Sequence, residues 1–305
     1  MQSYVVAVGN PGVDHYYRCE NWPALGDKAR VYYLESVVGG MIANAGCILA
    51  RYGVTTRLLA QLGDDEFLPR IQEDLARYGL DLDYATVEAG MANNQNFIML
   101  SENEKTIFLV QNEKPAFRLS GGQQALLEGA AYVYTTIADL KRIQGHRTLL
   151  DRLVEQGVGI FLDVESESFV NAEEDRAFFE AASVISFNGP AFDKFHAGPG
   201  GKDAWGRLRR MDDKIVVITK GEDGCSIFHE GRQFSLDAWR VAPADTTGAG
   251  DTFNASLLYG HLQGWDLQEA ARFATAAAAR SITFMGPKAG AVPVDEVLQF
   301  MQGTQ

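Results

Sequence analysis

The chain is poor in cysteine and lacks long apolar or basic runs, and each shortage excludes a class of protein. Its three cysteines, Cys19, Cys47 and Cys225, lie far apart in 305 residues and form no CxxC or Cys/His metal spacing. We therefore expect buried thiols in a reducing compartment. No apolar run approaches the ~18 residues of a membrane span. With a formal net charge of −13, nucleic acid and anionic membrane surfaces are not expected partners.

Two nucleotide-binding signatures and a leader pattern are also missing. The first apolar run, Tyr4–Val8, leads into GNPGVD rather than GxGxxG, which disfavours a dinucleotide oxidoreductase. The P-loop pattern GxxxxGK[ST] does not occur, so a phosphate must be held in another way. No basic segment or cleavage pattern precedes the first run, and we expect a cytoplasmic protein.

Strand-like and helix-like runs alternate through most of the chain. The predicted strands are Tyr4–Val8, Thr56–Leu62, Ala131–Thr136, Gly159–Asp163, Ser183–Phe187 and Lys214–Thr219. The predicted helices are Phe67–Tyr78, Thr148–Gln156, Asp175–Ala182, Phe253–Leu262 and Glu269–Ile282. This alternation predicts an α/β fold with a mostly parallel sheet covered on both faces. No linker divides the chain, so residues 1–305 are expected to form a single domain.

Two segments depart from this alternation. Val31–Val38 is rich in β-branched and aromatic residues, and Asn93–Leu100 and Thr106–Gln111 have the composition of a hairpin. These segments, approximately 15–38 and 93–112, predict a small separate sheet inserted in the domain.

The stretch from Asp245 to Ser256 (DTTGAGDTFNAS) is the strongest candidate for chemistry. Small residues at 248–250 let backbone N–H groups close on a ligand at a helix N-terminus, which forms an anion hole. Asp251 is a poor ligand for phosphate, because like charges repel, and is better placed to accept a proton from an attacking hydroxyl. The alternative is that Asp251 is an ordinary helix cap.

Polar and small residues follow other predicted strands. The loop after Tyr4–Val8 contains Asn10 and Asp14, which can bind hydroxyl groups at the carboxyl end of a parallel sheet. Gly39 and Gly40 permit close backbone approach to a ligand, and Asn44 can both donate and accept hydrogen bonds. Structural readings, a turn-capping aspartate above all, remain open for each residue alone.

Taken together, these motifs resemble the ribokinase-like (PfkB) carbohydrate kinases over nearly the whole chain. The resemblance implies a three-layer αβα sandwich with a mostly parallel central sheet and a small β-sheet lid. It implies ATP-dependent phosphorylation of a primary hydroxyl of a sugar or sugar-like substrate. Asp251 would be the general base, with Gly248, Ala249 and Gly250 as the anion hole. Asn10, Asp14, Gly39, Gly40 and Asn44 would bind the sugar.

The same resemblance assigns the nucleotide side and the cofactors. The implied nucleotide-binding residues are Asn188, Thr219, Gly221, Gly224 and Thr275. Asp245 and the carbonyl of Thr247 would hold a monovalent cation, K⁺ in that family. The expected cofactors are ATP and Mg²⁺, with K⁺ as a further one. The lid sheet often forms a dimer interface in the family, so a homodimer is the expected assembly. Gly63-Asp64-Asp65 would cap the following helix and shape the pocket rim.

Four positions depart from the family pattern. Ala191 stands where the family often has the Glu that orders magnesium-bound water, and Glu165 is a possible substitute. Met41 and Ile42 replace Lys and Gly of ribokinases, which disfavours ribose itself, and Ser256 replaces a usual Ala or Gly. A slow or repurposed enzyme is one consequence.

The alternatives are therefore a nucleoside kinase, a phosphosugar kinase, and a nucleotide-binding protein with weak or lost kinase activity. Tyr16, Tyr32 or Phe97 could stack on a purine in a nucleoside kinase. Lys28, Arg30 and Lys105 are the basic residues available to a phosphosugar.

Overall fold

The computed structural model describes residues 3–101, 104–110, 112 and 114–303. Eight strands of the described chain form the central sheet: β1 (Val5–Val8), β4 (Thr56–Leu59), β9 (Tyr132–Thr135), β10 (Gly159–Val164), β11 (Val184–Asn188), β12 (Ile215–Thr219), β13 (Cys225–His229) and β14 (Arg232–Leu236). Their order is β14-β13-β12-β11-β10-β9-β1-β4. The strands from β4 to β12 run parallel, and β13 and β14 close one edge antiparallel. The predicted α/β class is confirmed.

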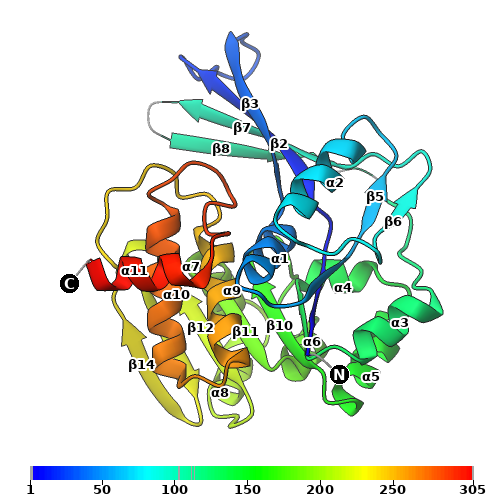
Figure 1. Ribbon diagram of the computed structural model, residues 1–305, viewed down its shortest axis with the longest axis vertical. Coiled ribbons are helices and arrows are strands. Elements are labelled where there is room, and N and C mark those ends of the chain that lie inside the picture. The colour runs from blue at the N-terminus through cyan, green and yellow to red at the C-terminus, as the bar shows by residue number, and fades with distance from the viewer. Residues whose placement is uncertain (1–2, 102–103, 111, 113, 304–305) are drawn as a thin grey trace.

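Helices cover both faces of this sheet (Figure 1). One layer contains α1 (Met41–Arg51), α2 (Leu68–Arg77), α9 (Ala249–Leu262), α10 (Leu267–Ser281) and α11 (Val294–Gly303). The opposite layer contains α3 (Gly121–Glu128), α4 (Ile137–Arg142), α5 (His146–Glu155), α6 (Arg176–Ala181), α7 (Gly189–Ala197) and α8 (Gly201–Leu208). The period of two along each strand divides the core, since Val5 and Ala7 join the first layer and Val6 and Val8 the second.

A second sheet stands at the carboxyl end of the central strands (Figure 1). Within the described residues it has the order β3-β2-β7-β8, formed by β2 (Gly12–Cys19), β3 (Val31–Gly39), β7 (Asn94–Ser101) and β8 (Glu104–Leu109). We call it the lid sheet. Its strands fall within or next to the two predicted segments, of which residues 102, 103 and 111 lie outside the described part.

Two predicted boundaries are wrong. The predicted strand Thr56–Leu62 is two strands, because the backbone N–H of Gln61 donates to Asn10 Oδ1 at 3.0 Å and the chain leaves the central sheet there. The second part, β5 (Gln61–Gly63), pairs instead with β6 (Thr86–Glu88). Asp14 lies inside strand β2 rather than in a loop.

The remaining thiol and membrane expectations concern the described residues alone. Cys19, Cys47 and Cys225 are buried and free, as predicted. No helix in the described part of the chain is long and apolar enough to cross a membrane.

Candidate active site

The entry to α9 has the geometry of an anion hole. Gly248 is the residue before the first helical position and has a φ of 78°, which favours glycine. A Cβ added there would lie 2.0 Å from the carbonyl oxygen of Pro287, whereas one added at Gly250 would meet nothing within 4 Å. Gly248 is therefore packed against the Pro287 carbonyl, whereas Gly250 has open space beside it at the N-terminus of a long helix, where N–H groups lack intrahelical partners.

Asp251 lies in the first turn of α9 and is buried. Its Oδ2 accepts a hydrogen bond from Asn44 Nδ2 at 2.7 Å. The alternative of an ordinary cap is wrong, because the helix begins after Gly248 and has no side-chain cap bond. Burial above all, and then the negative charge of Asp163, raise the pKa of Asp251 well above its usual value. A carboxylate with a raised pKa is a stronger base, as proton abstraction requires.

The raised pKa of Asp251 depends on an acid that the sequence did not single out. Asp163 is the fifth residue of β10 and is buried; its Oδ2 accepts a hydrogen bond from the Tyr134 hydroxyl at 2.7 Å. Burial also raises the pKa of Asp163. Only its position near the carboxyl end of a buried strand could have identified it.

Asp14 and Asn96 form the second polar pair of the site. Asp14 Oδ1 accepts from Asn96 Nδ2 at 2.7 Å, and the two residues are partners in the β2–β7 ladder. A Cβ on Gly39 would lie 2.6 Å from Asp14 Oδ2, so only glycine fits beside this carboxylate. Asn96 was missed, although Asn94 and Asn96 alternate on one face of a predicted strand.

Asn10 and Asn44 each retain an unused polar atom. Asn10 Nδ2 and Asn44 Oδ1 are buried and have no hydrogen-bond partner among the described residues. Buried amide atoms of this kind are costly unless a ligand or water binds them. Gly40, with a φ of 115°, brings the chain against this point, since its missing Cβ would lie 3.2 Å from the backbone oxygen of Asn10. Two of the predicted sugar-binding residues thus each have one buried polar atom that is free to bind a ligand.

Asp245 organises the loop before the anion hole. Its carboxylate accepts from the backbone N–H of Thr247 at 2.9 Å and of Gly286 at 3.0 Å. Burial by itself would raise the pKa of Asp245, but these hydrogen bonds outweigh it and leave the pKa below its usual value. Asp245 is therefore an ionised residue that joins two loops beside the anion hole.

The predicted nucleotide residues at the ends of β11 and β12 have structural partners. Asn188 Oδ1 caps α7 by accepting from the backbone N–H of Ala191 at 2.9 Å. Thr219 Oγ1 donates to the carbonyl of Phe187 at 3.3 Å. Ala191 is fully buried, so its position offers no oxygen to a cation.

The other three predicted nucleotide-binding residues differ in how much free space surrounds them. Gly221, with a φ of 60°, has nothing within 4 Å of an added Cβ. Gly224 faces β14 instead, because its Cβ would lie 1.9 Å from the Leu236 carbonyl oxygen. Thr275 is buried and donates through Oγ1 to the carbonyl of Arg272 at 2.9 Å. Of the three, Gly221 has the clearest access to a ligand.

A magnesium ion would find few protein ligands here. No group of three or more His, Cys, Asp or Glu side chains in the described residues could hold a metal ion. Glu165 directly follows β10 and is exposed. Partial loss of solvent around its carboxyl, and then the charge of Asp163, raise the pKa of Glu165 to about 7. Its charge also acts on Asp251. The residues fit a Mg²⁺ ion that keeps most of its waters and takes other oxygens from phosphates.

The departures at 42 and 256 have local packing reasons. Ile42 is buried against Gly9, whose added Cβ would lie 2.7 Å from Ile42 Cγ1. Ser256 Oγ and the Tyr52 hydroxyl are hydrogen-bonded at 2.9 Å inside the core. Neither change alters the polar groups around Asp251.

Some of the lid residues named for alternative substrates contact other side chains, and others are exposed to solvent. Lys105 Nζ donates to Thr247 Oγ1 at 3.4 Å, so the lid sheet reaches the loop before the anion hole. The Phe97 ring stacks on His15 at 5.5 Å, and burial raises the pKa of Tyr16 to about 12. Tyr32, Lys28 and Arg30 are exposed.

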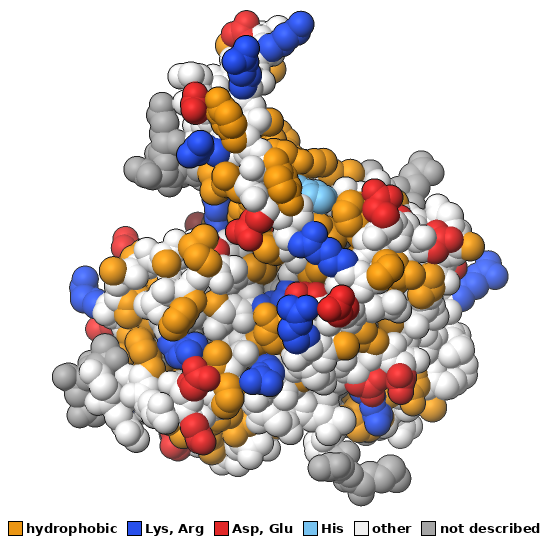
Figure 2. All heavy atoms as spheres, turned by 45° about the horizontal axis from the view of Figure 1, so that its top comes forward, with side chains coloured by type: hydrophobic (Ala, Val, Ile, Leu, Met, Phe, Trp, Pro, Cys, Tyr) orange, Lys and Arg blue, Asp and Glu red, His pale blue; other side chains and the backbone are white. Residues whose placement is uncertain are grey.

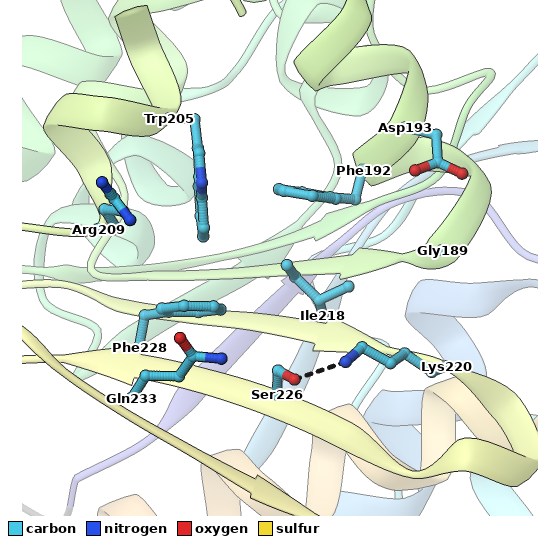
Figure 3. Close-up of a pocket in the computed structure, with 10 residues that line it drawn as sticks. All are labelled: Gly189, Phe192, Asp193, Trp205, Arg209, Ile218, Lys220, Ser226, Phe228 and Gln233. Carbon is cyan, nitrogen blue, oxygen red and sulfur yellow. Dashed lines mark hydrogen bonds between the residues drawn. The ribbon is translucent and has the colours of Figure 1, made fainter. Parts of the chain in front are cut away.

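A cavity of about 480 Å³ lies elsewhere, between α7, α8 and strands β12 and β13 (Figure 3). Its walls are the rings of Phe192, Trp205 and Phe228, which pack in the helix layer opposite Asp251. Lys220 Nζ, at its edge, donates to Ser226 Oγ at 2.7 Å. No paired acid and anion hole occur among its lining residues, so we place the active site at α9 despite the size of this cavity.

Comparison with known proteins agrees with the geometry. The sequence model of a family described as pfkB family carbohydrate kinase matches residues 2–294. A nucleoside kinase of Methanothermobacter thermautotrophicus is 24% identical over 278 residues, 90% of this chain and 87% of the relative. A fructoselysine 6-kinase of Escherichia coli is 28% identical over 260 residues, 81% of this chain and 90% of the relative. The structure of Arabidopsis thaliana ribokinase with ribose and ATP superimposes with a TM-score of 0.82 at 21% identity, covering 99% of each chain.

Proposed function

This chain belongs to the pfkB family of carbohydrate kinases, and on that premise we propose that it transfers the terminal phosphoryl group of ATP to a primary hydroxyl of a sugar or sugar-like alcohol. The observation that supports this reaction most directly is the position of Asp251. It lies one residue after the backbone of 248–250 at the N-terminus of α9, and its Oδ2 accepts a hydrogen bond from Asn44. A proton acceptor and an anion hole are thereby adjacent, as an in-line attack on a phosphoryl group requires.

Asp251 accepts the proton of the acceptor hydroxyl as that oxygen attacks the phosphorus. The hydrogen bond from Asn44 fixes the orientation of the carboxylate, so one oxygen remains for the hydroxyl. The N–H groups of Gly248, Ala249 and Gly250 meet the charge of the transferring group; loss of one such donor in other enzymes costs about 10²–10³ in rate.

The acceptor lies against the side chains that surround Asn10. Asp14 accepts hydrogen bonds from two hydroxyls of the acceptor at most, because Asn96 occupies one face of its carboxylate. Asn10 Nδ2 donates and Asn44 Oδ1 accepts, which gives both their missing partners. Gly39 and Gly40 leave the space that the ligand needs.

The nucleotide lies along the ends of β11 and β12, with Asn188, Thr219 and Gly221 beside it and Gly224 shaping the turn. Thr275 on α10 is a further nucleotide-binding residue in this proposal. Glu165 would accept hydrogen bonds from the waters of a Mg²⁺ ion in place of an acid at Ala191, and the ion would neutralise phosphate charge. Asp245 and the carbonyl of Thr247 would hold K⁺.

The lid sheet also forms a homodimer in this proposal. Its large exposed side chains include Tyr33, Phe108 and Leu109, which are 59%, 48% and 53% exposed. Figure 2 shows the lid projecting from the body with hydrophobic side chains along its surface. Patches of this kind indicate an interaction surface. Sedimentation of the wild-type protein and of Phe108→Lys should give a dimer and a monomer.

A nucleoside kinase is the second candidate, and one of the relatives is named as such. Aromatic rings at the lid, with Phe97 stacked on His15, could hold a base. Nucleosides present the same primary 5′-hydroxyl, so the chemistry at Asp251 would be unchanged.

The decisive experiment is a screen for ADP release with ATP and Mg²⁺. The panel of acceptors contains aldoses, ketoses, sugar acids, fructosamines and nucleosides. A reaction without any acceptor measures the background release of ADP. Acceptor-dependent ADP release, with a phosphate ester confirmed by mass spectrometry, supports the proposal. Tight ATP binding with no acceptor turned over by any class would favour the nucleotide-binding alternative.

A further inference from the structure

Two basic side chains lie together beyond Asn10. Arg142, the last residue of α4, donates through Nη2 to Gln61 Oε1 at 2.8 Å. Lys114, in the segment after β8, donates through Nζ to Asn94 Oδ1. Each charge acts on the other, since Arg142 is among the groups that lower the pKa of Lys114. Their hydrogen-bond partners are neutral amides.

Both basic side chains connect directly to the acceptor pocket. Gln61 donates through its backbone N–H to Asn10 Oδ1 at 3.0 Å, and Asn94 Nδ2 donates to the Asn10 carbonyl at 3.4 Å. Asn10 Nδ2 is the buried donor without a partner. The cluster therefore contacts the partners of Asn10, whose Nδ2 is free to donate to a ligand.

The cluster is separated from Asp251 by a series of intervening contacts. The contacts run from Asp251 to Asn44, from the Asn44 backbone to Gly40, and from Gly40 to Asn10. Lys114 and Arg142 lie past Asn10 on this path. A molecule that presents a hydroxyl to Asp251 would direct its opposite end towards them.

Neither cation of the cluster forms a short ion pair with a described acid. Neither Lys114 nor Arg142 has an ion pair within 4.0 Å in the described part of the chain. The buried Lys288, by contrast, has Asp74 at 2.8 Å. Partly buried cations without partners are costly.

One acid faces this pair from α4. Asp139 accepts from Thr136 Oγ1 at 2.8 Å, and burial raises its pKa. Further away, Glu88 Oε1 accepts from Gln61 Nε2 at 3.5 Å. Among the described residues, two cations therefore lie beside one adjacent carboxyl. Burial above all, and then the charge of Arg142, lower the pKa of Lys114 to about 8.

We propose that Lys114 and Arg142 bind an anionic oxygen group, a carboxylate or a phosphate, at the end of the acceptor remote from the hydroxyl that is phosphorylated. The substrate class is then an acidic sugar or an acidic sugar conjugate. The planar fork of Arg142 suits two oxygens of either group, Lys114 adds a point charge, and Asn10 Nδ2 adds a third donor. The direction of the acceptor rests on the proposed function; the anion site itself does not.

The test is calorimetric binding without nucleotide, which does not depend on turnover. The probes are aldonates of five and six carbons, the alditols of the same carbon number, and hexose 1-phosphates. Wild-type protein should bind at least one acidic class about 30-fold or more tightly than the alditols. Preference for the aldonate or for the hexose 1-phosphate would support the site in either case. It would also show whether the anionic group of the ligand is a carboxylate or a phosphate. Equal affinity for acids and alditols would overturn the proposal.

Substitutions separate this site from general effects on folding. Lys114→Gln and Arg142→Gln should each weaken binding of the preferred acid about 10–100-fold and leave alditol binding within about twofold. The matched control is Arg147→Gln, an exposed arginine on the next helix, which should change neither. Equal losses for acids and alditols in the two site variants would contradict a charge-specific role.

A pH series supplies a second readout. Because Lys114 has a pKa of about 8, acid binding should weaken as pH rises above that value, while Lys114→Arg should retain it. Acid-selective binding without ADP release from any sugar would refute the kinase proposal and leave this inference intact. Phosphorylation of neutral sugars without any preference for acids would support the kinase proposal and refute the anion site.

Discussion

The two sides of the Asp251 carboxyl are built from different parts of the polypeptide. On the phosphate side the groups are backbone amides, and the residues that position them are glycines such as Gly248 and Gly221. On the acceptor side the groups are side chains, with Asp14 held by Asn96 and Asp251 held by Asn44. One side is fixed by chain conformation, the other by side-chain chemistry.

This difference indicates where the two specificities can change. A backbone amide is present whatever the side chain, so the phosphate side fails only when the turn itself is distorted. The acceptor side can gain or lose a substrate through one side chain, because each amide or carboxylate has one or two unused positions. The relatives include proteins named as a nucleoside kinase and as a fructoselysine 6-kinase.

Removing the proton acceptor between the two sides should have the largest effect. Asp251→Asn keeps the shape and the contact with Asn44 but removes the base, so kcat should fall about 10³-fold or more. ATP affinity should change less than about threefold, because the amides remain. Steady-state kinetics measures kcat, and calorimetry measures the affinity for ATP. Substantial turnover by the variant would remove the base assignment.

The pH profile of the wild-type enzyme gives a related result. The pKa of Asp251 is raised, and the ionised form is the active one. kcat/KM should therefore fall as pH decreases, with a midpoint above that of an ordinary aspartate. Any residual activity of Asp251→Asn should not show this decrease of kcat/KM at low pH.

The phosphate side should be broken by distortion of its turn. Gly248→Ala places a Cβ 2.0 Å from the Pro287 carbonyl oxygen at a φ of 78°, so we expect kcat to fall about 10²-fold and the melting temperature to drop. Gly250→Ala is the matched control for stability, since its Cβ meets nothing within 4 Å. Its melting temperature should be unchanged. Equal stability of both variants would show that the 248 turn is not strained by a side chain.

The acceptor side should respond in KM. Asp14→Ala removes a carboxylate that binds acceptor hydroxyls, so KM for the acceptor should rise about 10–100-fold while KM for ATP stays nearly constant. Asn96→Ala should reproduce a smaller part of this rise, because it frees Asp14 from its partner at 2.7 Å. Parallel changes for ATP and acceptor in steady-state kinetics would contradict the division between the two sides.

The same division explains what the sequence could predict. The proposed phosphate side could be located in the sequence because glycines before a helix start mark a backbone feature that is local in sequence. Gly248–Asp251 lies in the stretch Asp245–Ser256, which can be interpreted by itself. The alternation of apolar runs likewise predicted the central sheet, since Val5–Val8 and its neighbours are buried on both faces.

The acceptor side depends on contacts between distant segments. Asn96 meets Asp14 only because β2 and β7 pair in one register, and a shift by one residue would turn Asn96 to the other face. Arg142 reaches the pocket through Gln61, 81 residues away in the chain. Sequence periodicity does not determine such pairings. The break after Leu59 was missed for the same reason, since it follows from the contact between Gln61 and Asn10.

The smallest effect should come from the acid that borders both sides. Glu165 follows β10, its charge acts on Asp251, and its pKa is raised to about 7. Glu165→Gln should raise the Mg²⁺ concentration for half-maximal rate about threefold, because one carboxylate that accepts from metal-bound water is lost. The matched control is Glu167→Gln, an exposed acid two residues further on. An unchanged Mg²⁺ requirement in Glu165→Gln would mean that the phosphates and water suffice. The phosphate side would then contain no side chain with a role in binding Mg²⁺, which would sharpen the contrast with the acceptor side.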